Sequence, residues 1–519
     1  MKRVRSILAL TLALVLVLAM GTAAFAANTT EHTITIMNTQ ASHTYTAYQV
    51  FAGDVKTLEG KTVLTNISWG AGVDGDALLT ALKKSNNDVY GACANAEDVA
   101  NVLKGFTNSS TELDAFAKIV GEHLAAAAGT STESVSPYVI KVKGDGYYFV
   151  KDTGVLGNND AATKYILQVI EDSTIAAKVE LPTIDKVIVN ADSHNGGEGN
   201  GTAQDVGSDV SFKLTSKVPA MDGYTSYTYV VHDTLSDGLT FNNDVAVTIG
   251  GTTYTNFTVA QDGQSFTITF NDFINQKANA GKDIVITYSA KINEKALNRD
   301  DETNTVHLEY SNNPYDGSST GTTPDEVVYV YDFDIVIDKY TGDEADGTRL
   351  AGAMFVLKNA EGKYYHWNAV TKAVEWVSVD AEPDTLNKSA EEIKAAWEQL
   401  GVTVATTDAS GAARFSGLDV GSYSLKEIAA PAGYNLLKEE VTVTITASYN
   451  EDGTLKESSA ASTDNGQYFQ TEKIQNNAGT ELPSTGGTGT TIFYILGSLL
   501  VVVAGVLLVT RKRMNASEN

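Results

Sequence analysis

Two lysines occupy matching positions in two strand-like segments of the chain. Lys186 lies in "TIDKVIV" and Lys339 in "VIDKYTG", and in each segment an isoleucine stands two residues before the lysine. Residues two apart on a β-strand point to the same face, so a lysine beside a core-facing isoleucine is expected to be buried. A buried amine is costly unless it is neutral or consumed in a bond. Both lysines are therefore candidates for chemistry.

A carboxyl and a carboxamide would complete a reactive set around such a lysine. Burial lowers the pKa of a lysine and raises the pKa of a carboxylic acid, which yields a nucleophilic amine and a neutral acid that can polarise a carboxamide. The product would be an amide crosslink, with ammonia released. In the last third of the chain, Glu427 in "YSLKEIAAPAGY" and Asn476 in "TEKIQNNAG" are the candidate partners of Lys339.

The elements that must position these side chains are short alternating strands. Such runs, bounded by Gly, Asn, Asp or Pro, recur through the chain and predict antiparallel sandwiches. Two helical patterns, roughly 75–104 and 111–128, interrupt the first unit, and "SAEEIKAAWEQLG" predicts one helix with a capping box in the last. At 519 residues the chain is long enough for about three domains, each with its own core.

Both ends of the chain carry export signals. Residues 1–26 combine positive charges, an apolar run and a small-residue cleavage site, which predicts a cleaved signal peptide. Near the other end, residues 492–510 are free of charge and long enough for a transmembrane helix. The basic tail 511–519 marks the cytoplasmic side, so we expect the body to lie outside the cell.

Composition argues against several classes of function. The net charge of −27 disfavours nucleic acid as a partner, because phosphate binding needs clustered Lys and Arg. The single cysteine, Cys93, lies in an Ala-rich helical pattern and is expected to be a small buried residue, with a catalytic thiol as the alternative. No metal-binding spacing, phosphate loop or nucleophile elbow is present, so we expect no metal, no cofactor and no turnover enzyme.

The last third resembles the collagen-adhesin B-type domain of Gram-positive surface proteins. "YSLKEIAAPAGY" matches that family's E-box, which supplies a catalytic Glu, and "IDK", "LAGAMFVL" and an Asn near the end follow the same order. The resemblance implies that Lys339 and Asn476 form an isopeptide bond with Glu427 as the acid.

The middle third resembles the other isopeptide-forming sandwich of these proteins. By that resemblance, Lys186 and Asn304 would be joined, with Asp233 in "HDTLSDGLTF" as the acid. The plain alternative is a turn-forming aspartate and a strand-starting asparagine. The first strand of the first unit offers no lysine, and we expect that unit to lack a crosslink.

"LPSTG" matches the LPxTG sorting signal, whose residues are Leu482, Pro483, Ser484, Thr485 and Gly486. Sortases of this family cleave between the Thr and the Gly. The whole layout resembles sortase-assembled major pilin backbone subunits, in which a junction lysine of a YPK motif is the polymerising nucleophile. That motif is absent here. Lys178 is the favoured candidate and Lys186 the runner-up, because Lys186 cannot be both a consumed core residue and an exposed nucleophile.

The sequence thus predicts a mainly β protein of three tandem Ig-like or collagen-adhesin-type β-sandwich domains, the first with a helical insertion. The predicted parts are a signal peptide (1–26), an N-terminal pilin domain (28–179), a middle sandwich (180–331), a collagen-adhesin B-type sandwich (332–478), the sorting motif (482–486), the transmembrane helix (492–510) and the tail (511–519). The expected function is a structural pilus shaft subunit, secreted and covalently attached to the cell wall. The alternative is a monomeric wall-anchored adhesin.

The resemblance also implies partners. We expect pilus and housekeeping sortases, other copies of the chain joined covalently, peptidoglycan, and minor or tip pilins. The sequence does not identify a host or surface ligand.

Overall fold

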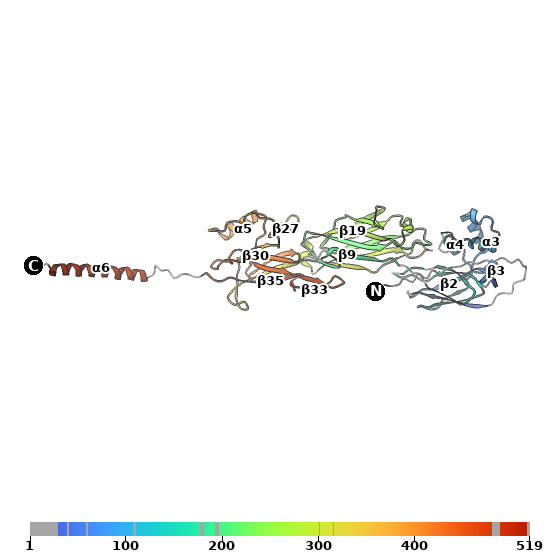
Figure 1. Cartoon of the computed structure of the whole chain (residues 1–519), viewed down its shortest axis with the longest axis horizontal. Helices are drawn as coiled ribbons and strands as arrows, with labels where there is room; N and C mark the ends of the chain where they lie inside the picture. Colours follow the sequence, from blue (N-terminus) through green and yellow to red (C-terminus); the bar gives the residue numbers. More distant parts are fainter. Residues whose placement is uncertain are drawn as a thin grey trace.

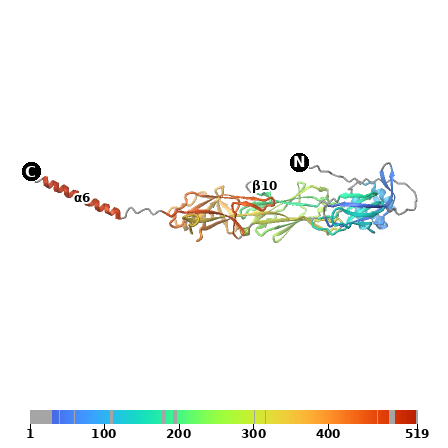
Figure 2. The ribbon, with the colours of Figure 1, turned by 90° about the horizontal axis from the view of Figure 1, so that it is seen from below.

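In the computed structural model of the chain, three β-rich units lie in a row and are followed by one long helix (Figures 1 and 2). The structure describes residues 30–38, 41–58, 61–106, 111–158, 160–162, 164–176, 181–191, 197–299, 301–314, 316–464, 466–479 and 488–515. The predicted signal peptide, Lys178, the sorting motif 482–486 and the end of the tail lie outside the described residues.

The first unit is a sandwich of two sheets with a helical layer on one side. Its sheets have the strand orders β5-β1-β8 and β3-β2-β6-β7, with β4 paired to β2. The strands are β1 (Glu31–Met37), β2 (Tyr45–Leu58), β3 (Lys61–Trp69), β4 (Gly129–Thr130), β5 (Tyr138–Lys143), β6 (Gly146–Asp152), β7 (Lys164–Val169) and β8 (Ser173–Ala176). Buried residues of both sheets, such as Ile34, Tyr45 and Ile140, form the core between them.

Four helices cover the other face of the larger sheet: α1 (Gly75–Ser85), α2 (Asn87–Tyr90), α3 (Ala96–Leu103) and α4 (Thr111–Glu122). The sequence pattern 75–104, expected as one helical stretch, is thus broken into three. The breaks fall at Asn86 and Asn95, whose side chains cap the next helix by accepting hydrogen bonds from the backbone N–H groups of Val89 and Asp98. Cys93 lies buried between α2 and α3, as expected for a small core residue.

The middle unit packs two seven-stranded sheets face to face. Their orders are β10-β9-β12-β19-β15-β16, with β14 on β19, and β11-β22-β20-β13-β18-β17, with β21 on β20. The elements are β9 (Ile184–Ala191), β10 (Gly197–Gly199), β11 (Gly201–Ala203), β12 (Asp209–Lys217), β13 (Tyr229–Leu235), β14 (Leu239–Phe241), β15 (Ala246–Ile249), β16 (Thr252–Tyr254), β17 (Phe257–Asp262), β18 (Ser265–Phe270), η1 (Phe273–Asn279), β19 (Asp283–Ile292), η2 (Glu294–Asn298), β20 (Glu302–Ser311), β21 (Thr320–Thr322) and β22 (Glu326–Tyr331).

The C-terminal unit is a second two-sheet sandwich with one helix. Its sheets run β24-β23-β35-β34, with β29 on β23, and β27-β26-β25-β30-β31, with β28 on β25; β32 and β33 form a separate pair. The elements are β23 (Phe333–Thr341), β24 (Thr348–Arg349), β25 (Met354–Lys358), β26 (Tyr364–Asn368), β27 (Ala373–Val377), α5 (Ala390–Gln399), β28 (Ala405–Thr406), β29 (Ala412–Leu418), β30 (Gly421–Ala429), β31 (Val441–Ile445), β32 (Ala447–Tyr449), β33 (Leu455–Ser458), β34 (Ser462–Asp464) and β35 (Gln467–Gln475). The expected capping box of Ser389 and Glu392 is present at the start of α5.

The middle and C-terminal units share one continuous hydrophobic cluster, whereas the sequence suggested separate cores. The reason is the short crossing: only Asp332 separates β22 from β23, and buried Tyr331 and Phe333 lie on either side of it. Asp205 reinforces this junction. Its carboxylate accepts hydrogen bonds from Trp376 Nε1 at 2.7 Å and from the backbone N–H of Asp419 at 2.8 Å, both in the C-terminal unit.

The last described element is α6 (Thr488–Asn515). Its segment Tyr494–Arg511 has a mean hydropathy of 2.1 and is long and apolar enough to cross a membrane. It contains most of the predicted span 492–510.

Candidate functional site

The middle unit buries Lys186 against Asp233 between its two sheets. Lys186 follows Ile184 on the inward face of β9 and is 2% exposed, as the alternation predicted. Its Nζ lies 2.9 Å from Oδ2 of Asp233. Asp233 lies inside β13, where it pairs with Val306 of β20, and not in a turn. A lysine from one sheet thus meets an acid from the other.

Asn304 reaches this pair through a tyrosine. Asn304 lies near the start of β20 and is fully buried, and its Nδ2 donates a hydrogen bond to the hydroxyl of Tyr288 at 2.8 Å. That hydroxyl donates in turn to Oδ2 of Asp233 at 2.6 Å. Among the described residues, Oδ1 of Asp233 and Oδ1 of Asn304 have no hydrogen-bond partner. All three predicted residues are therefore brought together, with Tyr288 between the acid and the amide.

Burial sets the protonation of the middle cluster. It lowers the pKa of Lys186 to about 8, against the opposing charge of Asp233. It raises the pKa of Asp233, against the opposing charge of Lys186 and the hydrogen bond from Tyr288. It also holds the pKa of Tyr288 well above its usual value. A neutral amine and a neutral acid are the state that attack on a carboxamide requires.

The C-terminal unit places Lys339 and Asn476 side by side. β23 and β35 are parallel neighbours, with Lys339 opposite Ile474, and Asn476 follows the last residue of β35. Lys339 Nζ lies 2.5 Å from Oδ1 of Asn476, and Lys339 and Asn476 are almost fully buried. The amine of one strand therefore faces the carboxamide at the end of its neighbour.

Glu427, on β30 of the opposite sheet, contacts both partners directly. Its Oε1 lies 3.3 Å from Lys339 Nζ and accepts a hydrogen bond from Asn476 Nδ2 at 2.8 Å. Its Oε2 accepts from the backbone N–H of Leu437 at 2.8 Å, which fixes the carboxylate. Burial lowers the pKa of Lys339, against the opposing charge of Glu427. The acid can thus exchange protons with both the amine and the amide.

Aromatic side chains lie beside both amines. Nζ of Lys186 lies 5.5 Å from the ring centroid of Phe212 and 5.8 Å from that of Tyr288, and Nζ of Lys339 lies 5.5 Å from that of Phe355. These rings exclude water, which keeps the dielectric low around the amines.

Sequence reasoning did not identify Tyr288. The sequence indicates only that Tyr288 points inward, because it lies at an alternate position of β19 together with Ile284 and Ile286. On that evidence it could not be distinguished from an ordinary core aromatic, since alternation within one strand does not say which residue of the facing sheet it meets.

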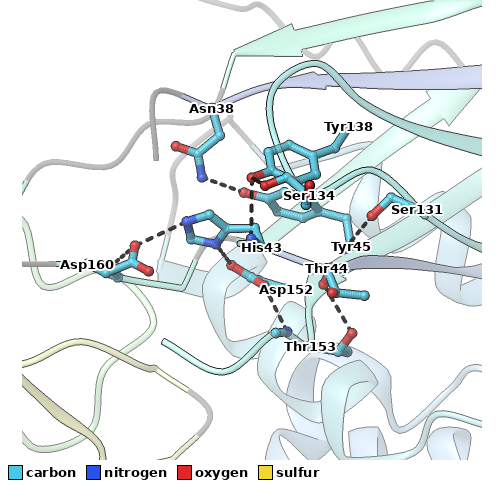
Figure 3. Close-up of polar contacts among 12 residues, drawn as sticks. Asn38, His43, Thr44, Tyr45, Ser131, Ser134, Tyr138, Asp152, Thr153 and Asp160 are labelled. Carbon is cyan, nitrogen blue, oxygen red and sulfur yellow. Dashed lines mark hydrogen bonds and ion pairs between the residues drawn. The ribbon is translucent and has the colours of Figure 1, made fainter. Parts of the chain in front are cut away.

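The first unit has a buried polar cluster of a different composition, shown in Figure 3. His43 lies between two carboxylates, with its Nδ1 2.5 Å from Asp152 Oδ2 and its Nε2 3.1 Å from Asp160 Oδ1. Burial lowers the pKa of His43, but the hydrogen bond and charge of Asp152, together with the charge of Asp160, outweigh it and raise the pKa above the usual 6.5. Beyond this cluster, Tyr310 of the middle unit donates to the backbone carbonyl of Asp160 at 3.5 Å.

Comparison with known proteins assigns parts of the chain to described families. Residues 206–314 match the "Gram-positive pilin backbone subunit 2, Cna-B-like domain", residues 334–459 match the "Prealbumin-like fold domain", and residues 474–515 match the "LPXTG cell wall anchor motif". The chain belongs to the backbone pilins of Gram-positive bacteria. This pilin is a structural shaft subunit that joins other pilin copies, and it is a surface protein attached to the cell wall.

Two relatives that match over most of the chain agree with this assignment. The pilin is 27% identical to the fimbrial subunit type 2 of Actinomyces naeslundii, over 90% of its own length and 83% of that protein. It is 25% identical to the trypsin-resistant surface T6 protein of Streptococcus pyogenes serotype M6, over 69% of its own length and 73% of that protein. The solved structure of the T6 backbone pilin, described as a modular three-domain protein, shares the fold with a TM-score of 0.51 at 18% identity, covering 87% of this chain and 94% of that one.

Proposed function

We propose that this pilin is polymerised by a sortase and that its middle and C-terminal domains each close a Lys–Asn isopeptide bond without an enzyme. The domains are 28–179, 180–331 and 332–478, and the bonds join Lys186 to Asn304 and Lys339 to Asn476. Asp233 and Glu427 are the respective acids.

The observation that carries the proposal is the contact of Lys339, Asn476 and Glu427. A buried amine lies 2.5 Å from the oxygen of a carboxamide, and one carboxyl oxygen touches both the amine and the amide nitrogen. Keeping an ionisable amine buried costs free energy, and the amide that replaces it cannot carry a charge. The cluster is suited to a reaction that takes place once.

The chemistry balances without a cofactor. The neutral amine of Lys339 attacks Cγ of Asn476, a bond forms between Nζ and Cγ, and the bond from Cγ to Nδ2 breaks. Glu427 gives a proton to the departing nitrogen and takes up the proton that Nζ loses. Ammonia leaves, and the acid is regenerated.

Each bond would close a loop of well over a hundred residues. By the chain-entropy argument used for disulfides, such a loop stabilises its domain by about 5 kcal/mol. The single cysteine excludes an intramolecular disulfide, so this chemistry takes over the role of disulfides in an exported protein.

Intact-mass spectrometry of residues 28–478 tests the crosslinks. The wild-type protein is expected to be lighter than its sequence by two ammonia molecules, and Asn476→Ala and Asn304→Ala should each retain one bond. A wild-type protein of full sequence mass would overturn the proposal.

For polymerisation, a sortase would cleave between Thr485 and Gly486 and transfer the Thr to a lysine of the next copy. Lys178 is our candidate nucleophile. Lys186 is the weaker candidate, because its amine is buried and contacts Asp233. Pilus and housekeeping sortases, minor or tip pilins and peptidoglycan are the proposed further partners.

Co-expression with a pilus sortase tests this assignment. The wild-type chain should yield a ladder of covalent polymers, and Lys178→Ala should abolish it. A ladder that survives in Lys178→Ala but is lost in Lys186→Ala would reassign the nucleophile.

A further inference from the structure

The two candidate crosslinking clusters differ at both ends of the carboxamide. Lys339 Nζ contacts Oδ1 of Asn476, whereas Oδ1 of Asn304 has no hydrogen-bond partner among the described residues. The contacts of the amide nitrogen differ as well. In the C-terminal cluster, the acid oxygen accepts directly from the amide nitrogen of Asn476. In the middle cluster, the hydroxyl of Tyr288 occupies that place, accepting from Asn304 Nδ2 at 2.8 Å and donating to Asp233 Oδ2 at 2.6 Å. The nitrogen that must leave as ammonia therefore touches a tyrosine.

We propose that Tyr288 is a catalytic residue of the middle-domain crosslink, relaying a proton from Asp233 to Nδ2 of Asn304. This inference rests on the proposed function, since it assumes that the Lys186–Asn304 bond forms. It assigns a fourth member to a cluster that otherwise consists of lysine, acid and amide.

The relay uses the same chain of contacts with its hydrogen bonds reversed: once Nδ2 can accept a proton, the hydroxyl of Tyr288 turns to donate to it and accepts from the carboxyl of Asp233. When Nζ of Lys186 has added to Cγ of Asn304, Nδ2 becomes pyramidal, and its lone pair is no longer delocalised into the carbonyl and becomes basic. Tyr288 then gives its hydroxyl proton to Nδ2 and takes one from the carboxyl of Asp233. The bond from Cγ to Nδ2 breaks, ammonia leaves, and Asp233 recovers the proton that Nζ of Lys186 loses. The net change is the transfer of one proton from Nζ to Nδ2, and no oxidant or reductant is needed.

The surroundings of Tyr288 suit this task. Its ring is packed against those of Phe212, Phe241 and Phe266, with centroids 5.3, 5.9 and 5.1 Å away, so the hydroxyl is held in place. Burial holds the pKa of the phenol well above its usual range, and the charge of Asp233 adds to this effect. The hydroxyl therefore keeps its proton until a strong base forms beside it, and the pyramidal Nδ2 is such a base.

Tyr288→Phe tests the relay, with Tyr229→Phe as the matched control. Tyr229 is also buried in the middle domain, but its hydroxyl donates to Ser216 Oγ, away from the cluster. Residues 28–478 of each variant are purified promptly and incubated, and the fraction with each crosslink is followed by intact mass and peptide mapping. Removing a general acid typically slows a reaction by about 10²- to 10⁴-fold.

We expect Tyr288→Phe to close the middle bond at least about a hundredfold more slowly while its C-terminal bond forms as in the wild type. Tyr229→Phe should form both. A Tyr288→Phe protein that closes the middle bond at the wild-type rate overturns the relay and leaves the proposed function intact. A wild-type protein whose intact mass equals its full sequence mass, with no ammonia lost, overturns the proposed crosslinks themselves.

A second experiment distinguishes catalysis by Tyr288 from a purely structural role. Tyr288→Phe and Tyr229→Phe are each combined with Asp233→Asn, a background in which the middle bond is not expected to form. Equal thermal stability of the two double variants supports catalysis. A Tyr288→Phe double variant that alone fails to fold would assign Tyr288 to packing and overturn the relay.

Discussion

The middle and C-terminal domains contain the same reactive side-chain types but bring the acid to the amide in different ways. Glu427 reaches Asn476 directly, with 2.8 Å between Oε1 and Nδ2. Asp233 has one methylene fewer, and a tyrosine hydroxyl spans the distance to Asn304. Under the proposed mechanism, both domains require a proton path from the acid to the amide nitrogen, and the fold builds this path with one side chain in the C-terminal domain and with two in the middle domain.

Removing either acid should have the largest effect. Glu427→Gln and Asp233→Asn preserve the shape of the side chain but cannot move a proton. The intact mass of each variant should therefore show the loss of one ammonia molecule, where the wild type loses two. The affected domain should lose about 5 kcal/mol of unfolding free energy, measured by calorimetry. If either amide variant still forms its bond, that acid is not required and the parallel between the domains fails.

The next effect concerns the pH dependence of an unreacted middle domain. In Asn304→Ala, Lys186 remains an amine with a folded-state pKa of about 8, below its ordinary value of 10.5. The unfolded state then binds more protons between these values, so stability should rise with pH from about 8 to about 10.5, by about 3 kcal/mol at most.

Denaturant unfolding across this pH range measures the effect. Asn304→Ala/Lys186→Met, which lacks the amine, serves as the control and should show no such rise. Equal pH profiles in the two variants would contradict a buried amine of lowered pKa.

A shorter acid in the C-terminal domain tests whether the acid must reach the amide directly. Glu427→Asp keeps a carboxyl group but gives this domain the acid length of the middle domain without placing a tyrosine beside it. We expect the Lys339–Asn476 bond to form about tenfold or more slowly, seen as a time-dependent loss of ammonia. Formation at the wild-type rate would show that the length of the acid is unimportant.

The smallest effect is expected in the first domain, whose buried cluster relies on charge. The pKa of His43 is raised in the folded state, so its contribution is fully present below about pH 6.5 and is lost as pH rises through the higher folded-state value. His43→Gln should therefore destabilise the protein more at acidic than at alkaline pH, in thermal unfolding of residues 28–478. A loss that grows with pH would contradict a protonated His43.

Local patterns predicted much of this architecture. Strand alternation was enough to predict the burial of Lys186 and Lys339, because side chains at alternate positions of a strand point to the same face. The contact partner of a residue depends on how two sheets are stacked, and this is why Tyr288 was missed. Likewise, the helical period of 75–104 is visible in the sequence, but the period alone does not show that Asn86 and Asn95 end one helix and cap the next. The shared core of the last two domains depends on the short crossing at Asp332, which a strand pattern alone does not reveal.

The position of Asn304 has a consequence for how a fibre of these subunits would lengthen. In the C-terminal domain, the proposed bond ends at Asn476, and only the short segment 477–479, which pairs with 433–435, follows it among the described residues of the domain. In the middle domain, the rest of β20 and all of β22 lie outside the closed loop, and β22 folds back so that Val330 pairs with Glu302. Asn304, at the start of β20, and the end of β22 lie at the same end of this strand pair. Tension between these two points would therefore break the hydrogen bonds between β20 and β22 one after another. Under the proposed crosslinks, this part of the middle domain could therefore extend under load, whereas the loop closed by Lys186 and Asn304 could not.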